Sequence, residues 1–315
     1  MNLHRTTAVK PQCEVRKLVT NHIPVLLKEV LYYLNPKPGE NFIDCTIGFG
    51  GHTFEIAERI APNGKVLGIE LDKEVLKETK LQASSFKFGK NIVLHNGNFT
   101  DLKNIVAKYN FSPVNGVLFD LGMSSWHLEK SGRGFSFLRD EPLLMNYELN
   151  NKLTAMEIVN HWHKKDLIKI FREYGEEKYS KRIAEEIVKQ RKNKPIITTF
   201  QLVEIVRGAV PRRYRYKRTH FATRIFQALR IAVNDELSNL QKALFEALKI
   251  LSPQGRLVII SFHSLEDRIV KNFFKQQDKL GNLKILTKKP VVPTKEEIRK
   301  NRRSRSAKLR AGVKQ

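Results

Sequence analysis

Apolar and polar positions along the first part of the chain alternate in a way that predicts strands separated by helices. The short apolar runs that predict buried strands lie at 41–45, 66–70, 92–94, 116–120 and 256–262. Stretches with apolar residues every three or four positions follow the first two runs, at 53–60 and 73–81. Strands that alternate with helices form parallel sheets, so we predict an α/β fold with a doubly wound, Rossmann-like sheet.

The alternation stops between about residues 130 and 220, where the pattern is helical throughout. Amphipathic helices are predicted at 155–159, 164–174, 180–192 and 199–208. A long helix at 222–251 then leads through a turn at 252–255 into the last strand. We therefore predict a helical domain inserted into the α/β domain.

This pattern divides the chain into four parts. Residues 1–20 form a predicted flexible segment, and the sequence does not decide whether this segment is a targeting peptide. Residues 21–130 and 221–286 make up the α/β domain, and 131–220 the insertion. Residues 287–315 are basic and low in apolar content. This tail is either a solvated, partly disordered segment or an arm that becomes ordered on RNA.

The turn after the first predicted strand carries the strongest chemical signal. Gly48, Gly50 and Gly51 precede His52, and Glu70 ends the second strand 20 residues after Gly50. Glycines let a ligand approach the backbone, and an acid at this point accepts hydrogen bonds from ribose hydroxyls. The pattern is not GxGxxG, so it favours S-adenosylmethionine (SAM), which has no pyrophosphate, over NAD. His52 could contact that ligand or serve as a packed helix residue.

The charge and the cysteine content of the chain indicate which kinds of partner and metal it can bind. The 57 Lys and Arg residues against 32 Asp and Glu give the 315-residue chain a net charge of +25. This excess favours RNA, and we expect neither DNA nor a membrane as partner. The two cysteines show no spacing typical of a zinc site, so no metal is expected. No apolar run is long enough to span a bilayer, and we expect a cytoplasmic protein. The sequence does not determine its oligomeric state.

Further candidates lie at the ends of the other predicted strands, the edge where doubly wound sheets bind ligands. Phe99 follows the third strand and could stack on an adenine or pack in the core. Asp120 ends the fourth strand, where a carboxylate is a poor choice for stability alone. Phe262 and His263 follow the last strand, with residues 264–267 resembling a helix cap. We expect these side chains at one site.

Basic residues form two clusters that suit RNA. Residues 211–218 interleave arginines and a lysine with tyrosines, and 301–310 hold a second group of arginines and lysines. Basic side chains contact phosphates and aromatic rings stack on bases, so both clusters are candidate RNA contacts. A solvated, charged loop is the plainer alternative for the first cluster.

Taken in order, several motifs resemble the ribosomal RNA small subunit methyltransferase H family. They are HIPVLL at 22–27, GGH at 50–52, DLGxSS at 120–125, GRGFSF at 132–137, YGEE at 174–177, ATRxFQALRI at 222–231, IISFHSLEDR at 259–268 and RSAKLR at 305–310. The resemblance implies a SAM-dependent enzyme that methylates N4 of a cytidine in the decoding region of small-subunit (16S) rRNA. It also implies a largely assembled small subunit as substrate and an insertion that recognises it.

The resemblance also assigns the site residues. The implied SAM contacts are Gly50, Gly51, His52, Glu70, Phe99, Asp120 and His127. The family usually has Asp at position 70 and often Gln at 127. Glu and His retain hydrogen-bonding groups at these two positions, so both contacts are still expected.

The attacking amine needs an acceptor that holds it in line with the methyl group. Asp120, Ser124 and Ser125 are the candidate catalytic residues, because an acceptor at the N–H can share the developing positive charge. The chain lacks an Asp/Asn-Pro-Pro-aromatic motif here, so no general base is assigned. The rings that could hold a flipped base are Phe135, Phe137 and Phe262.

Three positions depart from the family's motifs and keep an alternative open. Leu144 and Asn146 stand where the family has an acid and a base, and Phe221 where it has proline. These changes leave the exact target nucleotide open. They also motivate a second hypothesis: a non-catalytic RNA-binding or ribosome-assembly factor that retains the methyltransferase fold.

Overall fold

A seven-stranded sheet forms the centre of the computed structural model, which describes residues 23–148 and 151–315. The strand order is β3-β2-β1-β4-β5-β7-β6. The strands are β1 (Phe42–Asp44), β2 (Val66–Glu70), β3 (Ile92–Asn96), β4 (Val114–Asp120), β5 (Leu251–Ser261), β6 (Leu283–Ile285) and β7 (Lys308–Lys314). Strands β1 to β5 are parallel to their neighbours in that group, and β7 is antiparallel to β5 and β6. The predicted Rossmann-like sheet is confirmed.

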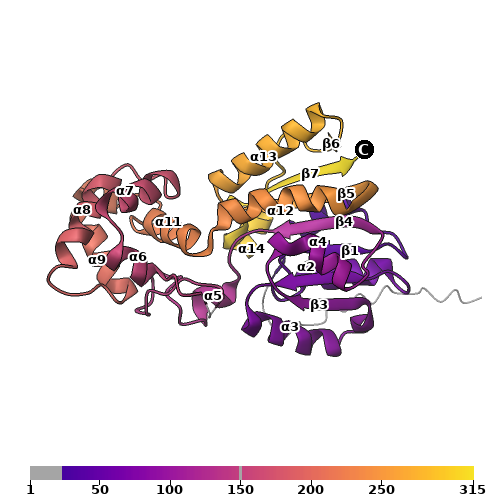
Figure 1. The fold of residues 1–315 in the computed structure, drawn as a ribbon, viewed down its shortest axis with the longest axis horizontal. Coiled ribbons are helices and arrows are strands. Elements are labelled where there is room, and N and C mark those ends of the chain that lie inside the picture. The colour runs from indigo at the N-terminus through magenta and orange to yellow at the C-terminus, as the bar shows by residue number, and fades with distance from the viewer. Residues whose placement is uncertain (1–22, 149–150) are drawn as a thin grey trace, which may run out of the picture.

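Helices cover both faces of this sheet (Figure 1). Phe42 packs against α1 (Leu27–Leu34) and α2 (Gly51–Ile60). The next residue, Ile43, points to the other face and packs with α4, α12 and α13. The bounds of the remaining α/β helices are α3 (Lys73–Ser84), α4 (Leu102–Lys108), α12 (Glu236–Ile250) and α13 (Ser264–Lys279). Because successive strand residues point to opposite faces, apolar runs without polar interruption produced two cores.

The inserted helices gather at one end of the molecule, away from the sheet (Figure 1). They are α6 (Ala155–His161), α7 (Lys164–Glu173), α8 (Ser180–Gln190), α9 (Thr199–Ala209), the short α10 (Arg212–Arg215) and α11 (Thr223–Asn234). Their buried faces form a separate hydrophobic core, which includes Leu167, Ile183, Leu202 and Ile225. The four helices predicted for this region occur within a few residues of their expected bounds.

The single long helix predicted at 222–251 is wrong. It is two helices, α11 and α12, separated at Asp235, whose φ of 48° breaks the helix. Ile225 and its neighbours on α11 pack in the core of the insertion, whereas Leu244 on α12 packs against the sheet. Because of this break, the apolar residues before and after Asp235 pack into two different cores. Judged by its packing, the insertion therefore continues past the predicted boundary at 220, to the end of α11.

The C-terminal segment was expected to be either a solvated, partly disordered tail or an arm that becomes ordered on RNA, and instead its last part is a strand of the sheet without RNA. Residues 308–314 form β7, an inner strand between β5 and β6, with Leu309 and Ala311 buried. On the other face of the strand, Arg310 Nε donates to Asp267 Oδ1 over 2.7 Å. Before it come α14 (Lys295–Lys300) and a 3₁₀ turn, η3 (Arg302–Ser306). Buried pairing at alternate positions thus outweighs the low apolar content of the segment.

Three other short elements complete the described chain. They are α5 (Ser125–Glu129), η1 (Gly89–Asn91) and η2 (Phe99–Asp101). Among the described residues, no helix is long and apolar enough to cross a membrane. The predicted flexible segment 1–20 and residues Cys13 and His22 lie outside the described residues.

Candidate functional site

A cavity of about 370 Å³ opens at the carboxyl ends of the parallel strands. The predicted site residues that line it are Gly51, His52, Glu70, Phe99, Asp120, Ser124, Ser125 and His127. Gly50 does not line it. The structure therefore brings nearly all of the predicted site residues to one place, as expected for the ends of neighbouring parallel strands.

The glycine turn shapes the backbone between β1 and α2. Gly50 precedes α2 with a φ of 79°, and a Cβ at this position would lie 2.7 Å from the ring of Phe54. A Cβ on Gly51 would lie 2.8 Å from the Pro24 side chain. Both glycines are therefore required by local packing. Gly51 also lines the cavity, while the predicted cofactor contact of Gly50 stays a prediction.

Glu70 closes this turn at the end of β2. Its carboxylate accepts hydrogen bonds from the backbone N–H of Gly48 at 3.1 Å and of Asp72 at 2.9 Å. Burial raises the pKa of Glu70 to about 7, although these backbone hydrogen bonds oppose the shift. The carboxylate is held in place by backbone groups and still has lone pairs for two ribose hydroxyls.

Asp120 lies at the end of β4 beside His52. Its Oδ2 is 3.6 Å from His52 Nδ1, and the other ring nitrogen of His52 is 3.0 Å from the carbonyl oxygen of Val25. Asp120 Oδ1 is buried and has no hydrogen-bond partner among the described residues. Burial, assisted by the carboxylates of Asp44 and Glu266, raises the pKa of Asp120 well above its usual value. The site therefore presents one unsatisfied acceptor at the end of the strand.

Ser124 and His127 lie in α5 and the turn before it. His127 Nδ1 is 2.8 Å from Ser124 Oγ, and Nε2 is 3.1 Å from Asp72 Oδ2. Burial lowers the pKa of His127, so the neutral ring donates from Nε2 to the carboxylate and accepts from the serine hydroxyl. Both ring nitrogens are thus engaged. The predicted hydrogen bond from His127 to the cofactor stays a prediction and would require one of these bonds to be exchanged.

Arg133 joins this part of the site to the insertion. Its guanidinium is buried and donates to Asp72 Oδ2 at 2.6 Å, to Glu74, and to the carbonyl oxygen of Tyr147 at 3.0 Å. The pKa of Asp72 lies below its usual value. Burial alone would raise this pKa, but hydrogen bonds from His127 and Arg133 outweigh that effect. Because the Asp72 N–H also holds Glu70, one network connects the insertion with the acid at the end of β2.

The rest of the cavity wall comes from residues that the sequence did not predict for the site. Besides neighbours of the predicted residues in the loops after β1 to β4, they include Ile23, Val25, Tyr147, Asn234, Glu236, Asn239, Leu240, Glu266 and Lys300–Arg303. Arg302 and Arg303 belong to the predicted basic cluster at 301–310, so charge was a signal for them. Tyr147 and Asn234 carry no such signal, because only the packing of the segment before α6 against the α11–α12 junction brings them here.

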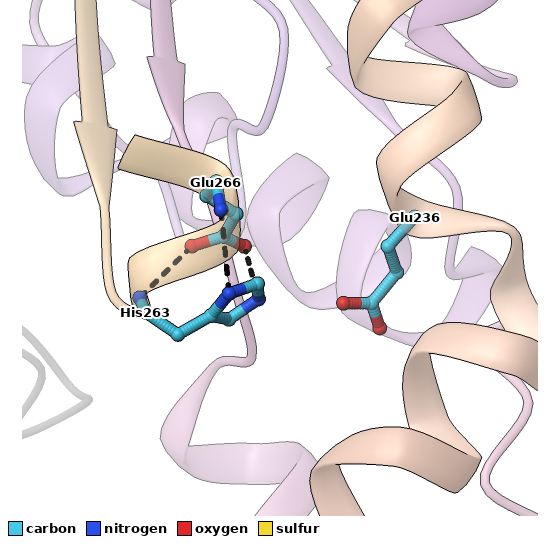
Figure 2. Close-up of side chains that lie close together, drawn as sticks. All are labelled: Glu236, His263 and Glu266. Carbon is cyan, nitrogen blue, oxygen red and sulfur yellow. Dashed lines mark hydrogen bonds and ion pairs between the residues drawn. The ribbon is translucent and has the colours of Figure 1, made fainter. Parts of the chain in front are cut away.

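Glu236 and Glu266 of this wall form a polar group with His263 (Figure 2). Their potential metal-ligand atoms lie within 4.8 Å of one another. Both oxygens of Glu236 already accept from the Arg230 guanidinium at 2.8 Å, and Glu266 Oε2 accepts from the N–H of Phe262 at 2.8 Å. The helix cap predicted from Ser264 and Asp267 is wrong: His263 is the N-cap of α13 and Glu266 completes the capping box.

The aromatic candidates are distributed over different environments. Phe262 lines the cavity, as predicted for a ring that could hold a base. Phe135 is buried and stacks on Tyr147, with ring centroids 5.1 Å apart. Phe137 stacks on His220 at 4.4 Å. Of the three, Phe262 therefore has the position that suits a base in the cavity.

The chain matches the family model described as the MraW methylase family over residues 19–315. The chain belongs to this family. One curated relative is ribosomal RNA small subunit methyltransferase H of Dictyoglomus thermophilum, which is 48% identical to this chain over 92% of this chain and 96% of that protein. The protein of the same name from Carboxydothermus hydrogenoformans is 44% identical over 93% of this chain and 98% of that protein. The MraW methylase assignment confirms the predicted resemblance and the methyltransferase activity.

The cavity of this MraW methylase fits SAM. Glu70 offers acceptors for ribose hydroxyls, Phe99 offers an aromatic ring, and the turn at 48–51 offers a close backbone approach. The carboxyl groups of Glu70, Asp120, Glu236 and Glu266 also line the cavity, which suits a cofactor with a positive sulfonium. The cofactor is therefore SAM, in agreement with the family.

Proposed function

We propose that this protein transfers the methyl group of SAM to the exocyclic N4 amine of a cytidine in the decoding region of small-subunit (16S) rRNA. The observation that carries the proposal is Asp120, a buried carboxylate at the cofactor cavity with one oxygen that lacks a hydrogen-bond partner among the described residues. An amine that is to be methylated carries the N–H donors that such an oxygen needs. The names of the relatives support small-subunit rRNA as the substrate class.

The proposed chemistry relies mainly on position. When bound, SAM would supply an activated methyl group: the S–CH3 bond breaks as the N–CH3 bond forms, neutral S-adenosylhomocysteine is the leaving group, and the methylated nitrogen then loses a proton. Glu70 holds the ribose, and the turn at 48–51 sets the depth of the cofactor. Asp120 Oδ1 accepts an N–H of the target amine, orients its lone pair toward the methyl group and stabilises the positive charge that develops on nitrogen. Ser124 and Ser125 are further candidate acceptors at the same turn.

The target nucleotide must leave its stack to reach this cavity. Phe262 is placed to contact the flipped base. Arg302 and Arg303 lie at the same cavity on exposed positions of η3, where they can contact the phosphates on either side of that nucleotide. We infer that the substrate is rRNA within a largely assembled small subunit, that the insertion recognises it, and that the reaction takes place in the cytoplasm.

The experiment that tests the proposal is transfer of labelled methyl from SAM to small subunits that lack the modification, followed by nucleoside analysis of the rRNA. We expect N4-methylated cytidine as the labelled nucleoside. SAM binding without labelled RNA would overturn the proposal and favour the non-catalytic assembly factor. A different labelled nucleoside would show that the chemistry is correct and the target is not.

A further inference from the structure

Two buried polar atoms in the cavity wall lack a hydrogen-bond partner among the residues that the structure describes. They are Asp120 Oδ1 and the hydroxyl oxygen of Tyr147. Buried polar groups are nearly always paired in folded proteins, so unpaired ones at a binding cavity indicate partners that the ligand brings. The proposed function uses the first of these atoms and leaves the second without a role.

Tyr147 is held rigidly before any ligand binds. Its ring stacks on Phe135 with an interplanar angle of 21°, and it makes a T-shaped contact with the His127 ring, with centroids 5.0 Å apart. Its backbone N–H donates to Asn234 Oδ1 at 3.0 Å, and its carbonyl oxygen accepts from Arg133. The side chain and backbone are therefore fixed from several sides, and the position of the hydroxyl is set by the fold.

The two unpaired groups have opposite requirements. Asp120 Oδ1 needs a donor both when the carboxyl group is ionised and when it is protonated on Oδ2, the oxygen beside His52, whereas the Tyr147 hydroxyl has a proton to donate. Burial, together with the carboxylates of Glu236 and Glu266, raises the pKa of Tyr147 well above its usual value, so the hydroxyl keeps its proton. The Glu266 carboxylate also raises the pKa of Asp120, which shows that both groups lie in the field of the same residue.

We propose that Tyr147 is a specificity-determining residue, whose hydroxyl donates to the ring nitrogen next to the amine that Asp120 holds. This inference rests on the proposed function. Cytosine offers a donor at N4 and an acceptor at N3, which match Asp120 and Tyr147. Uracil offers an acceptor at O4 and a donor at N3. The Tyr147 hydroxyl could turn to accept from that donor, but the Asp120 oxygen would face another acceptor and lose its hydrogen bond, at a cost in affinity.

The position of Tyr147 in the molecule agrees with a role toward the base. It lies in the segment between α5 and α6 that leads into the insertion, and it reaches the cavity beside Asn234 and Glu236 of the α11–α12 junction. The residues that suit the cofactor's ribose and adenine lie elsewhere: Glu70 ends β2, and Phe99 begins η2 after β3.

The test combines Tyr147→Phe with removal of the acceptor from the base. Small subunits are reconstituted with rRNA that carries either cytidine or 3-deazacytidine at the target, since the latter replaces N3 with a C–H. We expect Tyr147→Phe to lower kcat/KM on cytidine by about 10- to 100-fold, because a buried acceptor loses its donor. On 3-deazacytidine, the wild type and the variant should be about equally slow. Tyr32→Phe, on an exposed ring remote from the cavity, is the matched control.

Three results would overturn the assignment. An equal fold-loss for Tyr147→Phe on both substrates would mean that the hydroxyl does not contact N3. A tenfold or larger increase in the Kd for SAM would assign the hydroxyl to the cofactor. Full activity of the variant on cytidine would leave Tyr147 without a role in the reaction. By contrast, a wild-type protein that transfers no methyl to the cytidine substrate would overturn the proposed function itself.

Discussion

The two walls of the cavity are built in different ways. The wall that suits the cofactor comes from the turns after β1 to β4, where Gly51, Glu70, Phe99 and Asp120 each lie at or just beyond the end of a strand. The second wall comes from segments that are far apart in the sequence, and it includes Tyr147, Glu236 and Arg302. The wall that suits the cofactor is thus made by neighbouring strand ends, whereas the wall left for the substrate is made by segments that only the folded chain brings together.

The forces that hold the two walls differ as well. Glu70 is positioned by backbone N–H groups of its own βαβ unit. Tyr147 is positioned through Arg133, Asn234 and stacked rings, which belong to the insertion and to α11. Substitutions in the first wall should therefore change cofactor binding, and those in the second should change substrate use or the joining of the domains.

The largest expected effect is at Asp120, where the two walls meet. Asp120→Asn keeps the size of the side chain and removes the carboxylate that stabilises positive charge on the amine. We expect kcat to fall by about 10²- to 10³-fold. Labelled methyl transfer measures this, with the exposed Asp101→Asn as control. Near-normal turnover of Asp120→Asn would remove Asp120 from the mechanism.

The next effect is on the network between the walls. Arg133→Met leaves the buried carboxylate of Asp72 without its guanidinium, and we expect a loss of about 3–5 kcal/mol in the free energy of unfolding. The double variant Asp72→Asn/Arg133→Met should recover part of this loss, because the uncompensated charge is gone. Denaturant titration measures both. Arg59→Met breaks the exposed pair with Glu55 and should cost less than about 1 kcal/mol.

Glu70 links cofactor binding to pH. Its folded pKa of about 7 lies above the ordinary 4.5, so the fold favours the protonated form and its stability falls as the pH rises from about 4.5 to 7. Without SAM, Glu70→Gln should therefore match the wild-type Tm at pH 4 and exceed it at pH 8. The same variant should bind SAM about tenfold or more weakly at pH 8. An unchanged Tm difference across this range would contradict the raised pKa.

The smallest effect is expected at the rim of the second wall. Arg302→Gln/Arg303→Gln should weaken RNA binding and lower the slope of log K against log salt by about 0.7–0.9 for each phosphate that the variant no longer neutralises. The matched control is Lys77→Gln/Lys80→Gln on the exposed face of α3. Equal slopes for both double variants would leave Arg303 with only its ion pair to Glu129.

The sequence predicted what depends on short stretches of chain. The parallel strands, the helices of the insertion and the turn at 48–51 each follow from residue patterns within about ten positions. The break at Asp235 was missed because both helices continue one amphipathic pattern, and only packing shows that they face different cores. Strand β7 was missed because its few apolar residues are buried by pairing with β5, far away in the sequence.

By itself, the sequence therefore determined the family, the sheet that carries the cofactor loops and the acids at the ends of β2 and β4. Tertiary structure alone decided which side chains complete the cavity. Tyr147, Asn234 and Glu236 reach it because the segment before α6 packs against the α11–α12 junction, and Arg302 because β7 returns the chain to the sheet. The physical reason is that backbone geometry fixes neighbours along a strand or turn, whereas contacts between distant segments depend on how whole cores pack.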